Sequence, residues 1–386
     1  MRPLVLIAAF FASCTSQPSA DAGQPAGGGE TAGGGAAGGG NPTAGGGDST
    51  AGGGSSTAGG GSSTAGGGAT YDGGLAPWPG ANAVATVDAT ATFSGNVSGA
   101  TYAPGVLWVV QNSPGVLFRL VWNGAQSAWL PDSTNGWSTG KPLRYPSGTG
   151  DPDAEGVTLA EAGTSAVYVA TERNNAVGAT SRLSVLRYDV SGTSSPLIAS
   201  HEWVVTADIP ATGANAGLES ITWVPDVDLV AKGFRDTRLA KAYAPADYPN
   251  HGGGLFVVGV ESTGLLYLYA LNHGDSTALR VASVSSGMPA IMGLEYDRET
   301  GYLWAHCDDT CSNRVSVLTV AGSGAFDVRA RFLPPSTLPN VNHEGIAIAP
   351  EAECVANRKP YFWVDDADTA GSTVRGDSIP CGAFIP

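Results

Sequence analysis

Three glutamates begin similar short motifs at widely spaced points of the chain, namely Glu155, Glu219 and Glu344. Asp153 lies two residues before the first of them. Carboxylates that converge repel one another and raise one another's pKa unless a positive charge compensates them. A hard cation with oxygen ligands is the natural compensator. We therefore predict that these four residues bind calcium, with the alternative that each glutamate only accepts backbone N–H bonds.

His343 lies directly before the third glutamate, and it is the only histidine beside one of these motifs. A histidine there is suited to general-base chemistry, paired with Glu344 or with a metal-bound water. We take His343 and Glu344 as candidate catalytic residues, with a hydrogen-bonded structural histidine as the alternative. Residues 76–386 contain no Gly-x-Ser-x-Gly motif, so a serine nucleophile of that type is not supported.

A second polar set follows the apolar runs that come after these motifs. It can be solvated turn residues or can hold a peripheral cation. Its members are Asn112, Glu172, Arg173, Glu261, Asp308, Asp309, Asp365 and Asp366.

The elements that must position these residues form a repeat. A small or acidic residue precedes a short apolar strand, and a strand rich in Leu, Trp, Tyr and Val follows. The copies begin at Ser98, Glu155, Glu219, Met292 and Glu344. Each interval has room for about four strands, which is typical of β-propeller blades. We predict an all-β fold, a β-propeller of five blades with six as the alternative.

The run Ala83–Phe93 precedes the first copy and has the pattern of a strand. It would supply the outer strand of the last blade and close the ring without a free sheet edge. The insertion from Asp226 to Gly253 carries four basic residues. It is either a basic cover over the acidic mouth or a solvated loop.

Five cysteines are present, and four of them lie in the C-terminal part: Cys307, Cys311, Cys354 and Cys381. Four cysteines allow three pairings. Cys307 and Cys311 would close a small loop, and Cys354 and Cys381 would staple the C-terminus to the last blade. Because the chain begins like an exported protein, we expect disulfides rather than a zinc site that includes His306.

The N-terminal part has the pattern of an export signal followed by a linker. Residues 1–13 have the short positive start and apolar run of a secretory signal, and small residues precede Cys14 as in bacterial lipoproteins. Residues 14–75 are rich in Gly, Ala, Ser and Thr and repeat Ser-Thr-Ala-Gly-Gly-Gly, so we expect a disordered tether. We therefore expect a lipid anchor at Cys14 in the outer membrane or at the cell surface, with residues 76–386 as the folded domain.

The formal net charge of −15 argues against nucleic acid as a partner, because a phosphate backbone would be repelled. Several segments resemble the bacterial phytase-like propeller family described as "esterase-like activity of phytase". They are Asp153–Val157, Thr171–Asn174, Gly217–Trp223, Asn342–Ile346, Trp363–Asp366 and Ser378–Cys381.

The resemblance implies calcium-dependent hydrolysis of a small phosphoester or ester. We expect the protein to be a monomer. No dense Lys/Arg pocket for a polyanion such as phytate is evident. The alternative is a non-catalytic propeller that binds a glycan, peptide or protein.

Overall fold

The structure is a computed structural model that describes residues 74–160, 165–213 and 215–385. The signal, Cys14 and nearly all of the expected tether lie outside these residues. By compactness the chain divides into Met1–Thr64 and Ala65–Pro386. In the described residues no helix has both the length and the apolar character needed to cross a membrane.

The described residues form five blades around a common centre, antiparallel except for the outermost strand pair of blade 1, which confirms the predicted five-bladed β-propeller. Blade 1 has β2 (Val97–Ala103), β3 (Val106–Gln111) and β4 (Val116–Asn123), with β5 (Ala128–Pro131), β6 (Lys141–Arg144) and β10 (Leu197–Ile198) outside. Blade 2 has β7 (Pro152–Thr158), β8 (Ala166–Asn174), β9 (Ser181–Asp189) and β11 (His201–Val204). Blade 3 has β12 (Leu218–Pro225), β15 (Gly254–Val260), β16 (Leu265–Leu271) and β17 (Ala278–Ser285).

Blade 4 has β18 (Gly293–Asp297), β19 (Tyr302–His306), β20 (Val315–Val320) and β21 (Phe326–Phe332). Blade 5 has β22 (His343–Ile348), β23 (Arg358–Asp365), β24 (Val374–Pro380) and, on its outer edge, β1 (Ala85–Thr86). Because β1 pairs antiparallel with β24, the start of the domain completes its last blade, as predicted for the run Ala83–Phe93.

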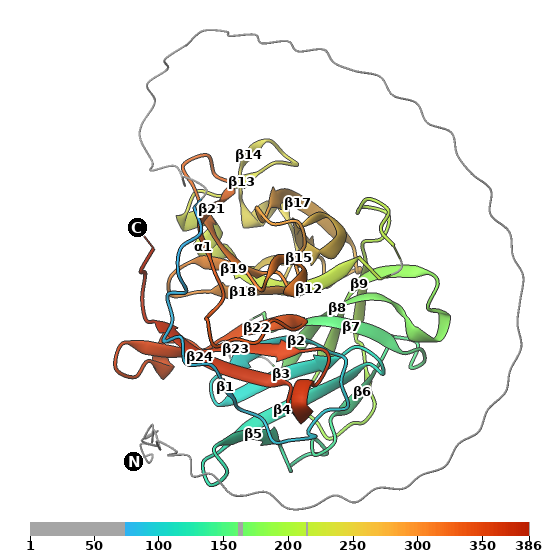
Figure 1. The fold of residues 1–386 in the computed structure, drawn as a ribbon. Helices are drawn as coiled ribbons and strands as arrows, with labels where there is room; N and C mark the ends of the chain where they lie inside the picture. The colour runs from blue at the N-terminus through green and yellow to red at the C-terminus, as the bar shows by residue number, and fades with distance from the viewer. Residues whose placement is uncertain (1–73, 161–164, 214, 386) are drawn as a thin grey trace, which may run out of the picture. The chain divides into compact units, whose positions relative to one another are not determined.

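The innermost strands contact one another in a closed cycle, in the order β2, β7, β12, β18, β22 and back to β2. Figure 1 shows these five strands gathered at the middle of the described domain. Five separate apolar clusters fill the five interfaces between neighbouring blades. The strands alternate in sequence between apolar residues that face one neighbouring blade and apolar residues that face the other, which explains their near-continuous apolar runs.

Small residues let the inner strands approach one another closely at the axis. A Cβ on Gly99 would lie 2.7 Å from the Cα of Gly156, and a Cβ on Gly345 would lie 2.8 Å from the Cα of Gly99. Contacts this short exclude any side chain, so glycine follows Ser98, Glu155 and Glu344 for a steric reason. This pinch separates the two ends of the central channel, leaving space there for about one water.

The insertion after β12 contains α1 (Asp226–Ala231) and a hairpin of β13 (Arg235–Asp236) and β14 (Lys241–Ala242). It joins the C-terminal end of β12 to the start of β15, whereas Glu219 lies at the start of β12. Of the two readings of this insertion, the cover over the acidic mouth is excluded, because the insertion leaves blade 3 at the opposite end. There it packs on its own blade and on blade 4, for example through the Arg235 N–H bond to Gly324.

Candidate functional site

One mouth of the central channel is lined by carboxyl groups, and β-bulges place them there. The strand register shifts around Ser98, Glu155, Glu219 and Glu344, each near the start of the innermost strand of its blade. A bulge adds a residue that the neighbouring strand does not match and turns its side chain out of the regular alternation. Blade 4 has no such shift, and Met292 stands at the corresponding position.

The second polar set reaches the same mouth, because the next strand in each blade runs antiparallel and ends there. One ligand oxygen from each of Asp153, Glu155 and Glu172 lies within 4.8 Å of the others. All three side chains are buried, with 1%, 3% and 1% of their surface exposed. Asn112, at the end of β3, donates from Nδ2 to Glu155 Oε2 over 3.3 Å.

One cation of the described residues compensates part of this charge. Arg173 Nε lies 2.6 Å from Asp153 Oδ2, which makes a buried ion pair. The pKa of Asp153 is nevertheless raised to about 6, first by burial and then by the charges of Glu172 and Asp151, against the lowering effect of Arg173. A single arginine therefore does not neutralise the cluster.

The glutamates of the first set interact strongly with one another. Burial raises the pKa of Glu155 well above its usual range, and the charge of Glu344 is the next largest cause. Burial also raises the pKa of Glu219, followed by the charges of Glu155 and Glu172. The carboxyls of Glu219 and Glu172 are close enough to share a hydrogen bond, which two ionised carboxylates cannot form. The pair needs a proton or a cation between its oxygens.

Glu344 is the most accessible of the three glutamates, because its side chain is only half-buried. Burial raises its pKa to about 8, with a further contribution from the charge of Asp366. Asn342 donates from Nδ2 to Glu344 Oε1 over 2.9 Å. Glu261, at the end of β15, has a pKa raised to about 7 by burial and by the charges of Glu172 and Asp308. Blades 2, 3, 4 and 5 thus all contribute acidic groups to one mouth.

Several buried oxygens at this mouth accept no hydrogen bond. They are Glu172 Oε2, Glu344 Oε2, Asn112 Oδ1 and Asn342 Oδ1. A buried acceptor without a partner costs about 1–3 kcal/mol. Carboxylate and amide oxygens are the ligands that calcium prefers, so this donor set fits a hard cation.

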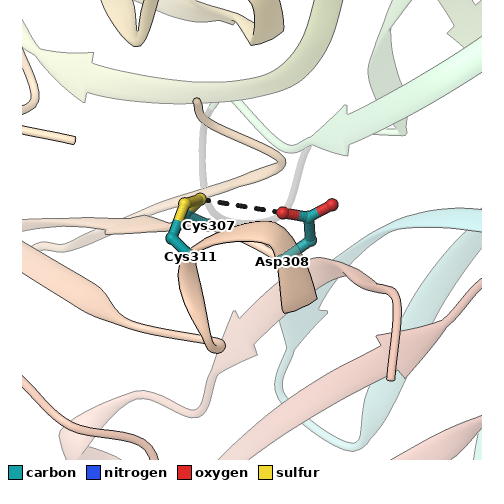
Figure 2. Close-up of side chains that lie close together, drawn as sticks. All are labelled: Cys307, Asp308 and Cys311. Carbon is teal, nitrogen blue, oxygen red and sulfur yellow. Dashed lines mark hydrogen bonds between the residues drawn. A yellow bond between two sulfur atoms is a disulfide. The ribbon is translucent and has the colours of Figure 1, made fainter. Parts of the chain in front are cut away.

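A disulfide positions the acidic residue of blade 4. Cys307 and Cys311 are bonded, and Asp308 follows the first cysteine at the end of β19 (Figure 2). Asp308 Oδ1 lies 3.7 Å from Cys307 Sγ and accepts the backbone N–H of Thr310 over 3.1 Å. Figure 2 shows these three side chains on one short turn, which fixes the carboxyl of Asp308 near those of Glu261 and Glu344.

The second disulfide joins Cys354 to Cys381 in blade 5. Both predicted pairings are therefore confirmed, and the zinc alternative at Cys307 and Cys311 is excluded because these sulfurs are bonded to each other. His306 is fully buried, and its Nε2 shares a hydrogen bond with the carbonyl of His343 at 3.1 Å.

His343 lies beside the acidic mouth in sequence but is completely buried. Its Nδ1 shares a 3.0 Å hydrogen bond with Asn313 Oδ1, and burial lowers its pKa to about 3. The ring is therefore neutral at physiological pH and has no solvent access, which matches the structural alternative considered from the sequence. Bulging at Glu344 separates the two neighbours, with Glu344 at the mouth and His343 in the interior.

Of the four predicted metal ligands, Asp153 and Glu155 contribute oxygens to one close group, and the structure adds Glu172 to it. Glu219 and Glu344 lie at the same mouth and interact with Glu155 through their charges, but they are not part of that close group. The sequence placed Glu172 only in a peripheral set, because its position at the end of β8 gives no sign of which mouth it reaches. The antiparallel pairing of β7 with β8 could have suggested it, since Pro152 lies opposite Asn174.

Five blades with an acidic mouth define the chain as a β-propeller. No protein-family model matches the sequence, and no curated protein matches it significantly. Among solved structures, glutaminyl cyclase of Myxococcus xanthus is 12% identical with a TM-score of 0.40, over 76% of this chain and 95% of that one. The RRP9 WD40 repeats are 10% identical with a TM-score of 0.39, over 78% and 98%.

The PQQ-bound aldose sugar dehydrogenase of Streptomyces coelicolor is 13% identical with a TM-score of 0.37, over 77% of this chain and 98% of that one. These likenesses are too distant to transfer an activity.

Proposed function

We propose that the protein is a calcium-dependent hydrolase of small phosphoesters or esters, acting at the acidic mouth. The observation that carries the proposal is the convergence of buried carboxyls with one arginine as their cationic partner among the described residues. Leaving several like charges uncompensated in a buried site is costly, and a divalent cation relieves that cost. The resemblance of the Glu-Gly motifs to the phytase-like propellers supports the same assignment.

Asp153, Glu155 and Glu172 would hold the cation, with Glu219 completing the oxygen set. When bound, calcium polarises a phosphoryl or carbonyl oxygen and stabilises the negative charge that develops there. Glu344 is the residue placed to move a proton, because it is partly accessible and its pKa of about 8 suits a group that exchanges protons near neutral pH. His343 would support the site by its hydrogen bond to Asn313, in the interior.

A non-catalytic binding function is the second candidate. It is favoured by the burial of the acidic residues, since Glu155 and Glu219 are 3% and 7% exposed. A cation so enclosed would hold the blades together and leave the outer face to bind a glycan, peptide or protein.

The location follows the N-terminal segment. We propose that Cys14 carries the lipid and that residues 14–75 hold the propeller away from the outer membrane or cell surface. Two disulfides are consistent with an oxidising compartment. Labelled palmitate would be incorporated into the wild-type protein and not into Cys14→Ser, whereas equal labelling would contradict the anchor.

The experiment that tests the function is calcium titration of the purified full chain by calorimetry, followed by turnover of aryl phosphates and aryl esters. We expect saturable calcium binding and a calcium-dependent activity that Glu344→Gln abolishes while the fold is retained. Binding without turnover on either substrate class would favour the second candidate. Absence of calcium binding would refute the metal assignment for both.

A further inference from the structure

A second cavity lies at the opposite mouth of the channel, where the innermost strands end. It has a volume of about 570 Å³, which is within the range of small-molecule sites. Tyr102, Leu159, Glu295 and Ile348 line it, and they come from the C-terminal ends of β2, β7, β18 and β22 or just beyond them. The pinch formed by Gly99 and its neighbours separates this cavity from the acidic mouth.

The walls of this cavity are mostly apolar, but three carboxyl groups (Glu295, Asp297 and Glu299) and two arginines (Arg119 and Arg298) also line it. Val106, Leu159 and Ile348 provide aliphatic surface, and Tyr102 and Trp108 provide aromatic surface. Glu295 accepts a 3.3 Å hydrogen bond from Thr101 Oγ1. Its side chain is half-buried, and a carboxylate among apolar side chains is stabilised by a proton or a cation close to it.

The charged groups around Glu295 are held by other partners. Arg119 is paired with Asp132, and the Nζ of Lys359 lies 2.8 Å from Asp297 and 4.0 Å from the exposed Glu299. Arg298 donates to the carbonyl of Ala160 over 2.7 Å and lies 4.7 Å over the ring of Trp223. Across residues 74–160, 165–213 and 215–385, Glu295 has no ion pair within 4.0 Å.

We propose that this cavity binds a small organic ammonium compound with an apolar body, and that the Glu295 carboxylate is its counter-ion. A protonated amine supplies the missing positive charge, and aromatic walls attract a cation through their π faces. Its hydrocarbon part would cover the aliphatic wall. The assignment does not depend on the function proposed for the acidic mouth.

The protonation of Glu295 gives the proposal a specific signature. Burial raises the pKa of Glu295 to about 8, while Thr101, Arg298 and Lys359 lower it and Asp297 raises it. At pH 7 the free carboxyl is therefore mostly protonated, and binding of an ammonium group must release that proton. The affinity rises as the pH rises toward 8, by roughly 50-fold from pH 6, because protonation of the carboxyl competes less with binding of the ammonium group.

The test is calorimetry of the full chain with phenethylamine, in two buffers of different ionisation enthalpy. For a compound of this size we expect a Kd of roughly 0.1–1 mM at pH 7, with release of close to one proton. The neutral analogue 2-phenylethanol should bind at least 10-fold more weakly. Equal affinity of the amine and the alcohol, or no binding of the amine at 10 mM, would overturn the proposal.

Two variants and a control identify the site. Glu295→Gln should weaken amine binding at least 10-fold and abolish proton release, and Leu159→Trp should block binding by filling the cavity without a change of charge. Asp327→Asn, at an exposed carboxyl of β21 that does not line the cavity, should change the affinity less than about twofold. Unchanged binding by folded Leu159→Trp would place the amine elsewhere and refute the assignment. Calcium binding should stay normal in all three variants, so failure here is distinguishable from failure at the acidic mouth.

Discussion

Replacing Glu172 by glutamine is the sharpest perturbation of the acidic mouth. Its side chain is 1% exposed, and Oε2 accepts no hydrogen bond in the described structure. Glutamine keeps the shape and one oxygen but removes the charge. Without calcium at pH 8, this change should stabilise the fold, because one of several repelling carboxylates is lost. With calcium present, the same change removes a charged ligand, so the gain from the metal should fall.

The size of the effect follows from binding linkage. Calcium at 100 times its Kd stabilises the wild-type protein by about 2.7 kcal/mol. For a folded unit of roughly 310 residues, the average unfolding entropy per residue converts this gain into a Tm increase of about 4 °C. If losing the ligand weakens binding tenfold, the gain at the same calcium concentration falls to about 1.4 kcal/mol, or about 2 °C.

The assay is differential scanning calorimetry at pH 8 with EDTA and with calcium. Asp327→Asn is the control, because it removes an exposed carboxylate on β21, an outer strand. The control should keep the full calcium shift. An equal calcium shift in Glu172→Gln and in wild type would show that the cation, if any, is bound elsewhere. A calcium-free Glu172→Gln protein less stable than wild type at pH 8 would refute the repulsion argument.

Three further outcomes are expected. In the absence of calcium, the free energy of unfolding should fall as the pH rises from 5 to 9. The pKa of groups such as Glu344 is raised in the folded state, so their protonated forms favour folding. Thermal melts at each pH measure this dependence, and a rise in stability over this range would contradict the assignment. Calcium affinity measured by calorimetry should increase between pH 6 and 8, since the cation displaces protons from the cluster, and a constant affinity would show that these carboxyls are already ionised. Gly156→Ala should lower the free energy of unfolding by about 1–3 kcal/mol in urea titrations, because its Cβ would lie 2.8 Å from the backbone nitrogen of Ile221, and an unchanged midpoint would mean that the axis is not tightly packed.

Much of the fold could be predicted from the sequence. Short apolar strands between turn residues recur after each small or acidic residue, and that repeat predicts blades because one blade cannot bury both of its faces alone. The strand-like run Ala83–Phe93 was expected to supply the outer strand of the last blade, and β1 pairs there with β24. The export signal and the positions of the four cysteines in the sequence together predicted both disulfides, Cys307 with Cys311 and Cys354 with Cys381.

The candidate site could be predicted only in part. Repeat position was enough to place Glu155, Glu219 and Glu344 at one mouth, because equivalent positions in blades meet around a common axis. It could not show that Glu172 joins them, nor that the neighbours His343 and Glu344 face different surroundings. β-Bulges determine both the placement of Glu172 and the different surroundings of His343 and Glu344. A bulge depends on how two paired strands fit together rather than on either strand alone.

The amino-acid sequence by itself determined the repeat of short strands that makes blades and the concentration of acidic residues at the strand starts, and it left five or six blades open. Only the tertiary structure decided which carboxyls share a buried space, how far their pKa values rise, and that a second cavity exists around Glu295 at the other mouth. The physical reason is that strand patterns are local, whereas burial and electrostatic repulsion depend on distances between residues from different blades.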